Sequence, residues 1–305
     1  MGSSPLSFCA CHDALVIESI PDIAFVERLG DGAPRLLIEV PHGADRRAHY
    51  DVWRSKMRGT LPADLHCFFH INTDVGAWQY GRRVAEKLGV PALLIRCLVP
   101  RTFVDTNRVV DAGDQLASGG MTAAIAPYIT DPRDVDALVA AHRSYVELTA
   151  RAYESVCGAG GFALSPHTYG PRTMPIAKID EHIVENIRKA HEPAVLEASP
   201  LRPELDLITR KKDGTRVAPA GMVEALTDAY ATLGITATES ATYTMSEATQ
   251  SWRWQMAYPE QMLCLEVRRD LLVERWLPFD EQTVSAAAAD RFATPLADAI
   301  GKRLS

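Results

Sequence analysis

Short apolar runs alternate with longer amphipathic stretches along the chain, a pattern typical of an α/β sheet. We expect strands at residues 35–40, 92–97, 162–164, 235–238 and 262–267. Helices are expected at 74–88, 134–157, 181–191, 219–233 and 281–302. Apolar residues recur at helical spacing within 74–88, and Asp74 is placed to cap the start of that helix.

No internal repeat or low-complexity tract divides the chain. Glycine, proline and charged residues concentrate in 193–218, which indicates a loop or hairpin insertion rather than a domain boundary. The sequence therefore predicts one domain over residues 1–305, built as a single mixed sheet flanked by helices.

Composition excludes several protein classes. Hydrophobic residues make up 47% and charged residues 23% of the 305 residues, values typical of a globular protein rather than a disordered or fibrous one. The net charge of -7 argues against a nucleic-acid-binding surface. Six scattered cysteines favour reduced thiols, and Cys9 with Cys11 gives only a weak metal signal.

Two further absences favour a cytoplasmic protein. No run approaches the ~18 apolar residues that span a bilayer. The first residues also lack the basic region that precedes the apolar segment of a signal peptide. We therefore expect no membrane partner.

Metal-capable side chains recur where predicted strands end, the edge at which open α/β sheets bind ligands. His42 follows the first strand, Asp74 opens the next helix and His167 follows a short apolar strand. Two histidines and a carboxylate with a position left for water form a catalytic zinc arrangement. Alternatively, His42 is only a turn histidine and Asp74 only a helix cap. Asp45 is a second candidate for the carboxylate ligand, because His-x-x-Asp is a compact chelating spacing. His70 is interpreted as a strand histidine.

Glu266 interrupts an apolar strand, and a carboxylate in such a run is either paired or functional. It is a candidate general base for metal-bound water, or one partner of a buried ion pair. Arg101, Asn107 and Arg108 follow another strand and supply planar donors that suit a small anion, unless they only form surface salt bridges. The chain has no G-x-G-x-x-G, Walker A or G-x-S-x-G run, which argues against nucleotide-dependent and serine-hydrolase chemistry.

Five segments in order resemble the N-formylglutamate amidohydrolase family, which is similar to zinc carboxypeptidases and aspartoacylase. They are Pro41-His42-Gly43, Asp74-x-Gly76, Arg101 with Asp105-Thr-Asn-Arg108, His167-Thr-Tyr-Gly-Pro171 and Leu265-Glu-Val-Arg-Arg-Asp-Leu271. The resemblance spans about residues 35 to 275 and implies a zinc-carboxypeptidase-like (phosphorylase/hydrolase-like) architecture. Residues 172–217 depart from the family pattern, and we expect them to form an insertion that rebuilds the pocket wall.

The resemblance implies a role for each site residue. His42, Asp74 and His167 would hold one Zn²⁺ or another divalent metal, with Asp74 preferred to Asp45. Glu266 would be the general base and then the acid, and Arg101 would stabilise the oxyanion. Asn107, Arg108 and Tyr243 would bind the substrate.

The implied function is a zinc-dependent amidohydrolase that cleaves N-formyl or other N-acyl amino acids, such as N-formylglutamate. The alternatives are a non-catalytic small-anion-binding protein on the same fold and a zinc-carboxypeptidase-like peptidase. The expected partner is a small anionic substrate, and the chain is expected to be a monomer or a homodimer.

Overall fold

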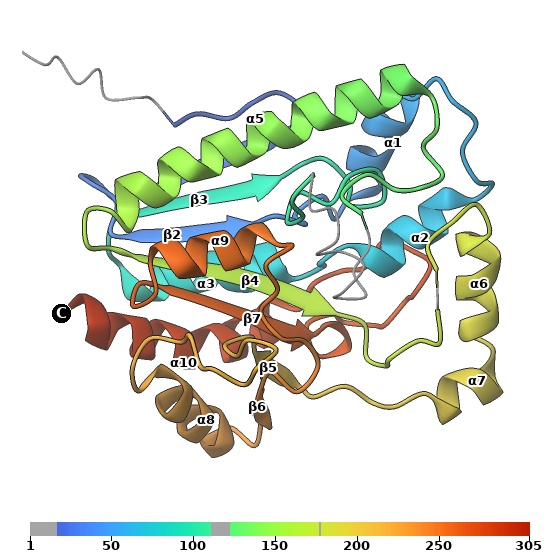
Figure 1. Ribbon diagram of the computed structural model, residues 1–305. Coiled ribbons are helices and arrows are strands. Elements are labelled where there is room, and N and C mark those ends of the chain that lie inside the picture. The colour runs from blue at the N-terminus through green and yellow to red at the C-terminus, as the bar shows by residue number, and fades with distance from the viewer. Residues whose placement is uncertain (1–16, 111–122, 177) are drawn as a thin grey trace, which may run out of the picture.

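The computed structural model describes residues 17–110, 123–176 and 178–305; Cys9 and Cys11 lie outside these ranges. A seven-stranded sheet with the order β1-β3-β2-β4-β7-β5-β6 runs through the centre of the molecule (Figure 1). The strands are β1 (Ala24–Leu29), β2 (Leu36–Val40), β3 (Ala92–Cys97), β4 (Phe162–Tyr169), β5 (Leu205–Leu207), β6 (Ala237–Glu239) and β7 (Met262–Arg268). The four central strands are parallel to one another, whereas β1 and β5 are antiparallel to their neighbours β3 and β7. The predicted mixed α/β sheet is confirmed.

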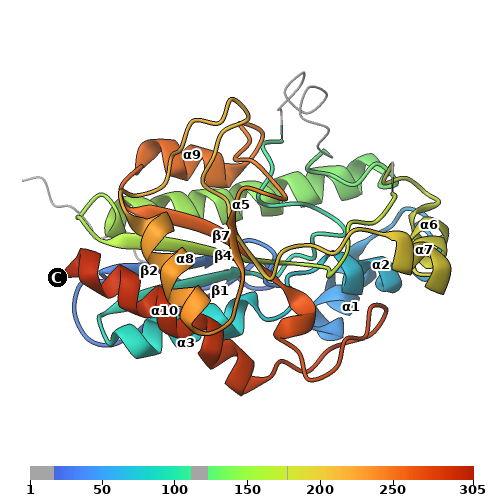
Figure 2. The ribbon, with the colours of Figure 1, turned by 90° about the horizontal axis from the view of Figure 1, so that it is seen from below.

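Helices cover both faces of this sheet (Figure 2). The helices are α1 (Arg47–Lys56), α2 (Leu65–Asn72), α3 (Ala77–Leu88), α5 (Pro132–Val156), α6 (Ile183–Ala190), α7 (Pro193–Ala198), α8 (Met222–Thr232), α9 (Gln250–Ala257) and α10 (Ala286–Leu304). Helices α5 and α9 pack on one face, and α3, α8 and α10 lie on the other.

Alternate residues of each strand face opposite layers. In β2, Leu37 joins the core beneath α5, whereas Leu36, Ile38 and Val40 join the core against α3 and α10. The same alternation places Ser165 and His167 of β4 beside their register partners Cys264 and Glu266 of β7. Polar residues at the carboxyl ends of the central strands therefore gather on one face of the sheet.

The strand predicted at 162–164 is longer than expected, because β4 continues through Pro166 to Tyr169. The amide of Ala163 donates toward β7, to the carbonyl of Gln261. Because backbone amides along a strand alternate in direction, the backbone nitrogen of Pro166 points toward β2, and the pairing of β2 with β4 ends before it, at Leu164. Proline breaks no ladder bond there, and the strand carries His167 onward.

Other expectations need correction. His70 lies in α2 and not in a strand, because Leu65–Asn72 buries an apolar helical face that the sequence analysis did not identify. The segment 193–218, predicted as a loop or hairpin, contains α7 and β5. The last helix begins at Ala286 and not at 281, and Glu281 instead accepts hydrogen bonds from Arg46 and the amide of Arg47. In the described parts of the chain, no helix combines the length and apolar character needed to cross a membrane.

Candidate metal centre and active site

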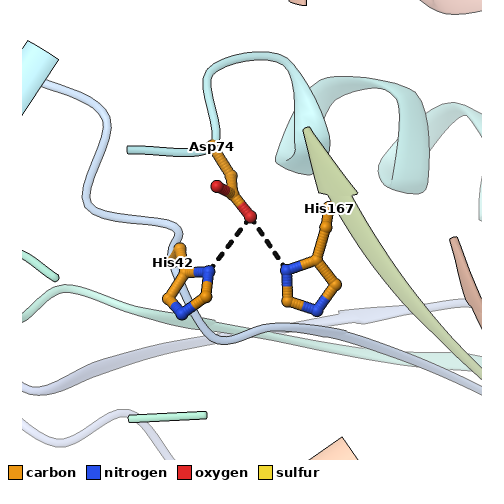
Figure 3. Close-up of side chains that lie close together, drawn as sticks. All are labelled: His42, Asp74 and His167. Atoms are coloured by element: carbon orange, nitrogen blue, oxygen red, sulfur yellow. Dashed lines mark hydrogen bonds and ion pairs between the residues drawn. The ribbon is translucent and has the colours of Figure 1, made fainter. Parts of the chain in front are cut away.

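Three side chains from separate elements converge at the carboxyl end of the central strands (Figure 3). His42 lies in the loop after β2, Asp74 in the turn before α3, and His167 in β4. All three are buried, at 3%, 3% and 4% exposure. The structure thus brings together the three residues predicted as metal ligands.

Their donor atoms are close enough to share one ion. Asp74 Oδ2 lies 3.1 Å from His42 Nδ1 and 2.9 Å from His167 Nδ1. One donor atom from each residue lies within 4.8 Å of the other two. Ligands bound at ~2.0–2.1 Å in a tetrahedral site stand about 3.3 Å apart, so small adjustments suffice to admit a zinc ion. The donor set, two imidazoles and a carboxylate, also fits zinc, and the group could hold a metal ion.

The local backbone explains how Asp74 reaches this position. The sequence analysis predicted Asp74 as a helix cap, but α3 begins at Ala77 with Gly76 as its N-cap. Gly76 has φ +92°, and a Cβ there would lie 2.9 Å from Leu272 Cδ1. Only glycine fits this turn without strain, and the turn directs the Asp74 carboxylate to the two imidazoles instead of to the helix amides.

The second ring nitrogen of each histidine also has a partner. His42 Nε2 lies 2.8 Å from Asp105 Oδ1, and His167 Nε2 lies 3.3 Å from the hydroxyl of Ser165. An acceptor at Nε2 favours the tautomer protonated there and leaves the Nδ1 lone pair for an ion. Both imidazoles therefore present the same atom to the centre.

Electrostatics at the centre favour a buried charge pair. Burial by itself would raise the pKa of Asp74, but the charge of His42 and hydrogen bonds from both imidazoles lower it far below its ordinary value. Burial would lower the pKa of His167, yet its hydrogen bond to Asp74 raises the pKa well above 6.5. A metal ion binding here must displace protons from this arrangement.

Glu266 lies on β7 directly beside His167 in the register of the sheet. Burial raises the pKa of Glu266 to about 7, while the charges of His167 and Arg101 oppose the increase. Its Oε2 atom is buried, with no hydrogen-bond partner in the described structure. A carboxyl group with this pKa can both accept and donate a proton near neutral pH.

A cavity of about 840 Å³ opens beside the triad. All five residues predicted for catalysis or substrate binding line it together with His42 and His167: Arg101, Asn107, Arg108, Tyr243 and Glu266. Ile208 and Lys211, from the segment 172–217, also line it. A cavity of this size accommodates a small molecule.

Asp105 organises the basic side of this cavity. Its Oδ2 accepts from Arg101 Nε at 3.0 Å and lies 3.6 Å from Arg108 Nε. Within the described ranges no other carboxylate forms an ion pair with either guanidinium. One negative charge therefore faces two positive charges, so the cluster of Asp105, Arg101 and Arg108 carries a net positive charge.

Asn107 and Tyr243 are partly engaged within the protein. The side-chain oxygen of Asn107 accepts from the amide and hydroxyl of Ser251 at the start of α9. The Tyr243 hydroxyl accepts from Arg202, whose guanidinium also stacks on the tyrosine ring. Their substrate-binding roles remain predictions.

Asp45, the rival ligand, is buried away from the triad. Its Oδ2 accepts from Gln79 Nε2 at 3.4 Å, and its Oδ1 lies 3.7 Å from Arg96 Nη1. The group of three that could hold a metal contains Asp74 and not Asp45.

Several residues of this site were not predicted from the sequence. Asp105 stands alone between two arginines, a signal that it balances both. Glu39 interrupts an apolar strand just as Glu266 does, and the same reasoning would have identified it. Ser165 carries no recognisable signal, because its position depends on β4 continuing past Pro166.

Comparison with known proteins gives no match to a family model and none to a curated protein. Solved structures do resemble the chain. A gene product of Agrobacterium tumefaciens is 18% identical with a TM-score of 0.57, over 92% of this chain and 94% of that chain. N-formylglutamate amidohydrolase from Ralstonia eutropha JMP134 is 17% identical with a TM-score of 0.57, over 92% and 98%. A bacteriophage poly-gamma-glutamate hydrolase is 11% identical with a TM-score of 0.39, over 94% and 90%.

At these identities the first two structures show the fold alone. The chain has the fold seen in the N-formylglutamate amidohydrolase structure, which confirms the predicted fold class. Membership of that family stays a prediction.

Proposed function

We propose that this protein is a metal-dependent amidohydrolase that cleaves the amide bond of an N-acyl amino acid, with N-formylglutamate as one candidate. One observation carries the proposal: a metal-competent triad, a carboxyl group poised for proton transfer and two arginines that share one carboxylate border the same cavity. The fold shared with an N-formylglutamate amidohydrolase is consistent with it.

In this proposal, His42, Asp74 and His167 hold the ion. A divalent ion there would supply a Lewis acid and would lower the pKa of water. Glu266 takes a proton from the attacking water and later delivers it to the nitrogen of the leaving amine. The C–N bond breaks, and the products are a carboxylate and a free amino acid.

The arginines act on the charges of the substrate. Arg101 faces the carbonyl oxygen and stabilises the negative charge that develops on it. Arg108 and Asn107 bind the carboxylate of the amino acid. Because Asp105 balances only one of the two guanidiniums, an anionic substrate completes the charge pairing of the cavity.

The test is hydrolysis of a panel of N-formyl, N-acetyl and larger N-acyl amino acids by zinc-loaded protein. We expect turnover that Glu266→Gln abolishes and that Glu185→Gln leaves unchanged, because Glu185 is an exposed residue paired with Lys189. Full activity of Glu266→Gln would refute the assigned base. Binding of the panel without turnover by any loaded protein would instead favour a non-catalytic anion-binding protein.

A second comparison tests whether Arg108 binds the substrate carboxylate. Arg108→Met should raise KM for an N-acyl amino acid much more than for the corresponding N-acyl amine, which lacks the carboxylate. An equal increase for both would show that Arg108 does not bind the carboxylate.

A further inference from the structure

Glu39 is a carboxyl group next to the carboxyl end of β2, at 4% exposure. It faces α5, and the hydroxyl of Tyr145 donates to its Oε1 at 2.7 Å. The hydroxyl of Ser165 donates to its Oε2 at 3.3 Å. Among the described residues, Glu39 is not part of the cavity lining and its side chain has no hydrogen bond to the triad, so the proposed reaction assigns it no role.

Ser165 connects Glu39 to the metal centre. Its hydroxyl lies 3.3 Å from His167 Nε2 and carries a single proton. When that proton is donated to Glu39, the serine oxygen can only accept from His167. Nε2 then carries the ring proton, and Nδ1 offers its lone pair toward the ion. The order Glu39–Ser165–His167 thus favours Nδ1 as the nitrogen that binds the ion.

The second histidine has the same arrangement in a shorter form. His42 Nε2 meets the Asp105 carboxylate directly at 2.8 Å. Each imidazole is therefore backed by a carboxylate, one in direct contact and one through a serine hydroxyl. Such outer partners fix ring orientation and tautomer at metal sites.

We propose that Glu39 is a positioning residue that acts through Ser165 to hold His167 in its metal-binding tautomer and orientation. This inference rests on the metal centre of the proposed function. Burial raises the pKa of Glu39, while the Tyr145 hydroxyl and positive charge at the histidines favour the ionised form. A bound cation therefore favours the ionised form of Glu39, which accepts the hydrogen bond from the Ser165 hydroxyl.

A purely structural role for Glu39 predicts something different. Removing a buried hydrogen bond would lower stability but would leave the zinc affinity of the folded protein unchanged. The proposed role predicts a loss of zinc affinity in protein that is folded. The zinc dissociation constant therefore separates the two.

The experiment is competition for zinc between a chelator and four proteins: wild type, Ser165→Ala, Glu39→Gln and the double variant. Ser199→Ala is the matched control, since Ser199 is a buried serine whose hydroxyl donates to the Val195 carbonyl. Circular dichroism confirms that each protein is folded. We expect Ser165→Ala to weaken zinc binding about 10- to 100-fold, and Ser199→Ala to bind as wild type does.

The double variant tests the route of the effect. Glu39→Gln should weaken binding less than Ser165→Ala, because the amide oxygen still accepts from the serine. Once Ser165 is absent, Glu39→Gln should cause no further loss, since Glu39 acts through the hydroxyl. Nitrogen-15 spectra of the zinc-loaded wild type should show His167 protonated at Nε2 and bound through Nδ1.

Three outcomes overturn the inference: unchanged zinc affinity in folded Ser165→Ala, additive losses in the double variant, or His167 bound through Nε2. Should Glu39→Gln fail to fold, Ser165→Ala and the nitrogen-15 spectra still decide. A wild-type protein that binds no zinc would instead refute the metal centre itself, so the two failures are distinguishable.

Discussion

Replacing Asp105 by asparagine should uncouple the metal centre from its basic surroundings. Asp105 is 3% exposed, and it contacts His42, Arg101 and Arg108 at once. Burial alone would raise its pKa, but the two guanidiniums and His42 hold the pKa well below its ordinary value. The change to asparagine keeps the shape and removes the charge.

The expected cost has two parts. Removing one partner of a buried ion pair costs about 3–5 kcal/mol. Because the Arg101 side chain is 30% exposed, solvent screens part of its charge, and we expect about 2–4 kcal/mol of unfolding free energy. Asp105 Oδ1 also accepts from the Asn107 amide at 3.0 Å, so the asparagine keeps its oxygen at that position. This neutral oxygen accepts from His42 Nε2 more weakly than the carboxylate does, which should reduce the preference for the Nε2-protonated tautomer and weaken zinc binding about 10- to 100-fold.

The assays are urea unfolding of the metal-free protein and zinc titration of the folded protein. Asp64→Asn is the control, because Asp64 also pairs with an arginine, Arg188, but at the surface. It should change neither quantity. Wild-type zinc affinity in Asp105→Asn would refute the reasoning that Asp105 sets the tautomer of His42.

Two further predictions concern the turn at the centre and the ion pairs around Glu239. Gly76→Ala should lower the free energy of unfolding by about 2 kcal/mol or more, because its φ is positive and an added Cβ would meet Leu272. Gly89 also has a positive φ (+65°) but open space around it, so Gly89→Ala should cost about 1 kcal/mol. Equal losses for the two variants in urea unfolding would contradict the packing argument. For Glu239, burial would raise the pKa, but hydrogen bonds from Arg216, Thr209 and Arg210 lower it to about 2. Glu239→Gln should therefore destabilise the protein at pH 7 by about 1–2 kcal/mol after allowance for solvent screening. Because the pKa in the folded state is depressed, the stabilisation is full above the unfolded pKa of about 4.5 and is lost as pH falls toward 2. Unfolding curves of the variant and wild type should converge over that range, and a difference that persists at pH 2 would count against the ion-pair explanation.

The parts of the fold predicted from sequence are those with strong local patterns. The central strands β2, β3 and β7 are largely apolar runs, and α3 and α5 have clear helical periodicity. Helix α2 was missed because Leu65–Asn72 is apolar on most sides, so its short sequence does not distinguish a helix from a strand. The continuation of β4 past Pro166 depends on where its pairing with β2 ends, which no local pattern reveals.

The candidate site divides in the same way. His42, Asp74 and His167 could be selected because each stands at the end of an element and the resemblance orders them. Glu39, Ser165 and Asp105 act on those residues through contacts across the sheet, and such contacts exist only once the strands are in register.

The most direct test of the account is calorimetric titration of zinc into metal-free wild type, Asp74→Asn and Asp45→Asn. Both aspartates are buried, and Asp45 is the one close in sequence to His42, but of the two it is Asp74 that contacts both imidazoles. We predict one zinc per chain in the wild type and in Asp45→Asn, and an affinity reduced more than about 100-fold in Asp74→Asn. Unimpaired zinc binding by Asp74→Asn, or its loss in Asp45→Asn alone, would contradict the assignment of the metal centre.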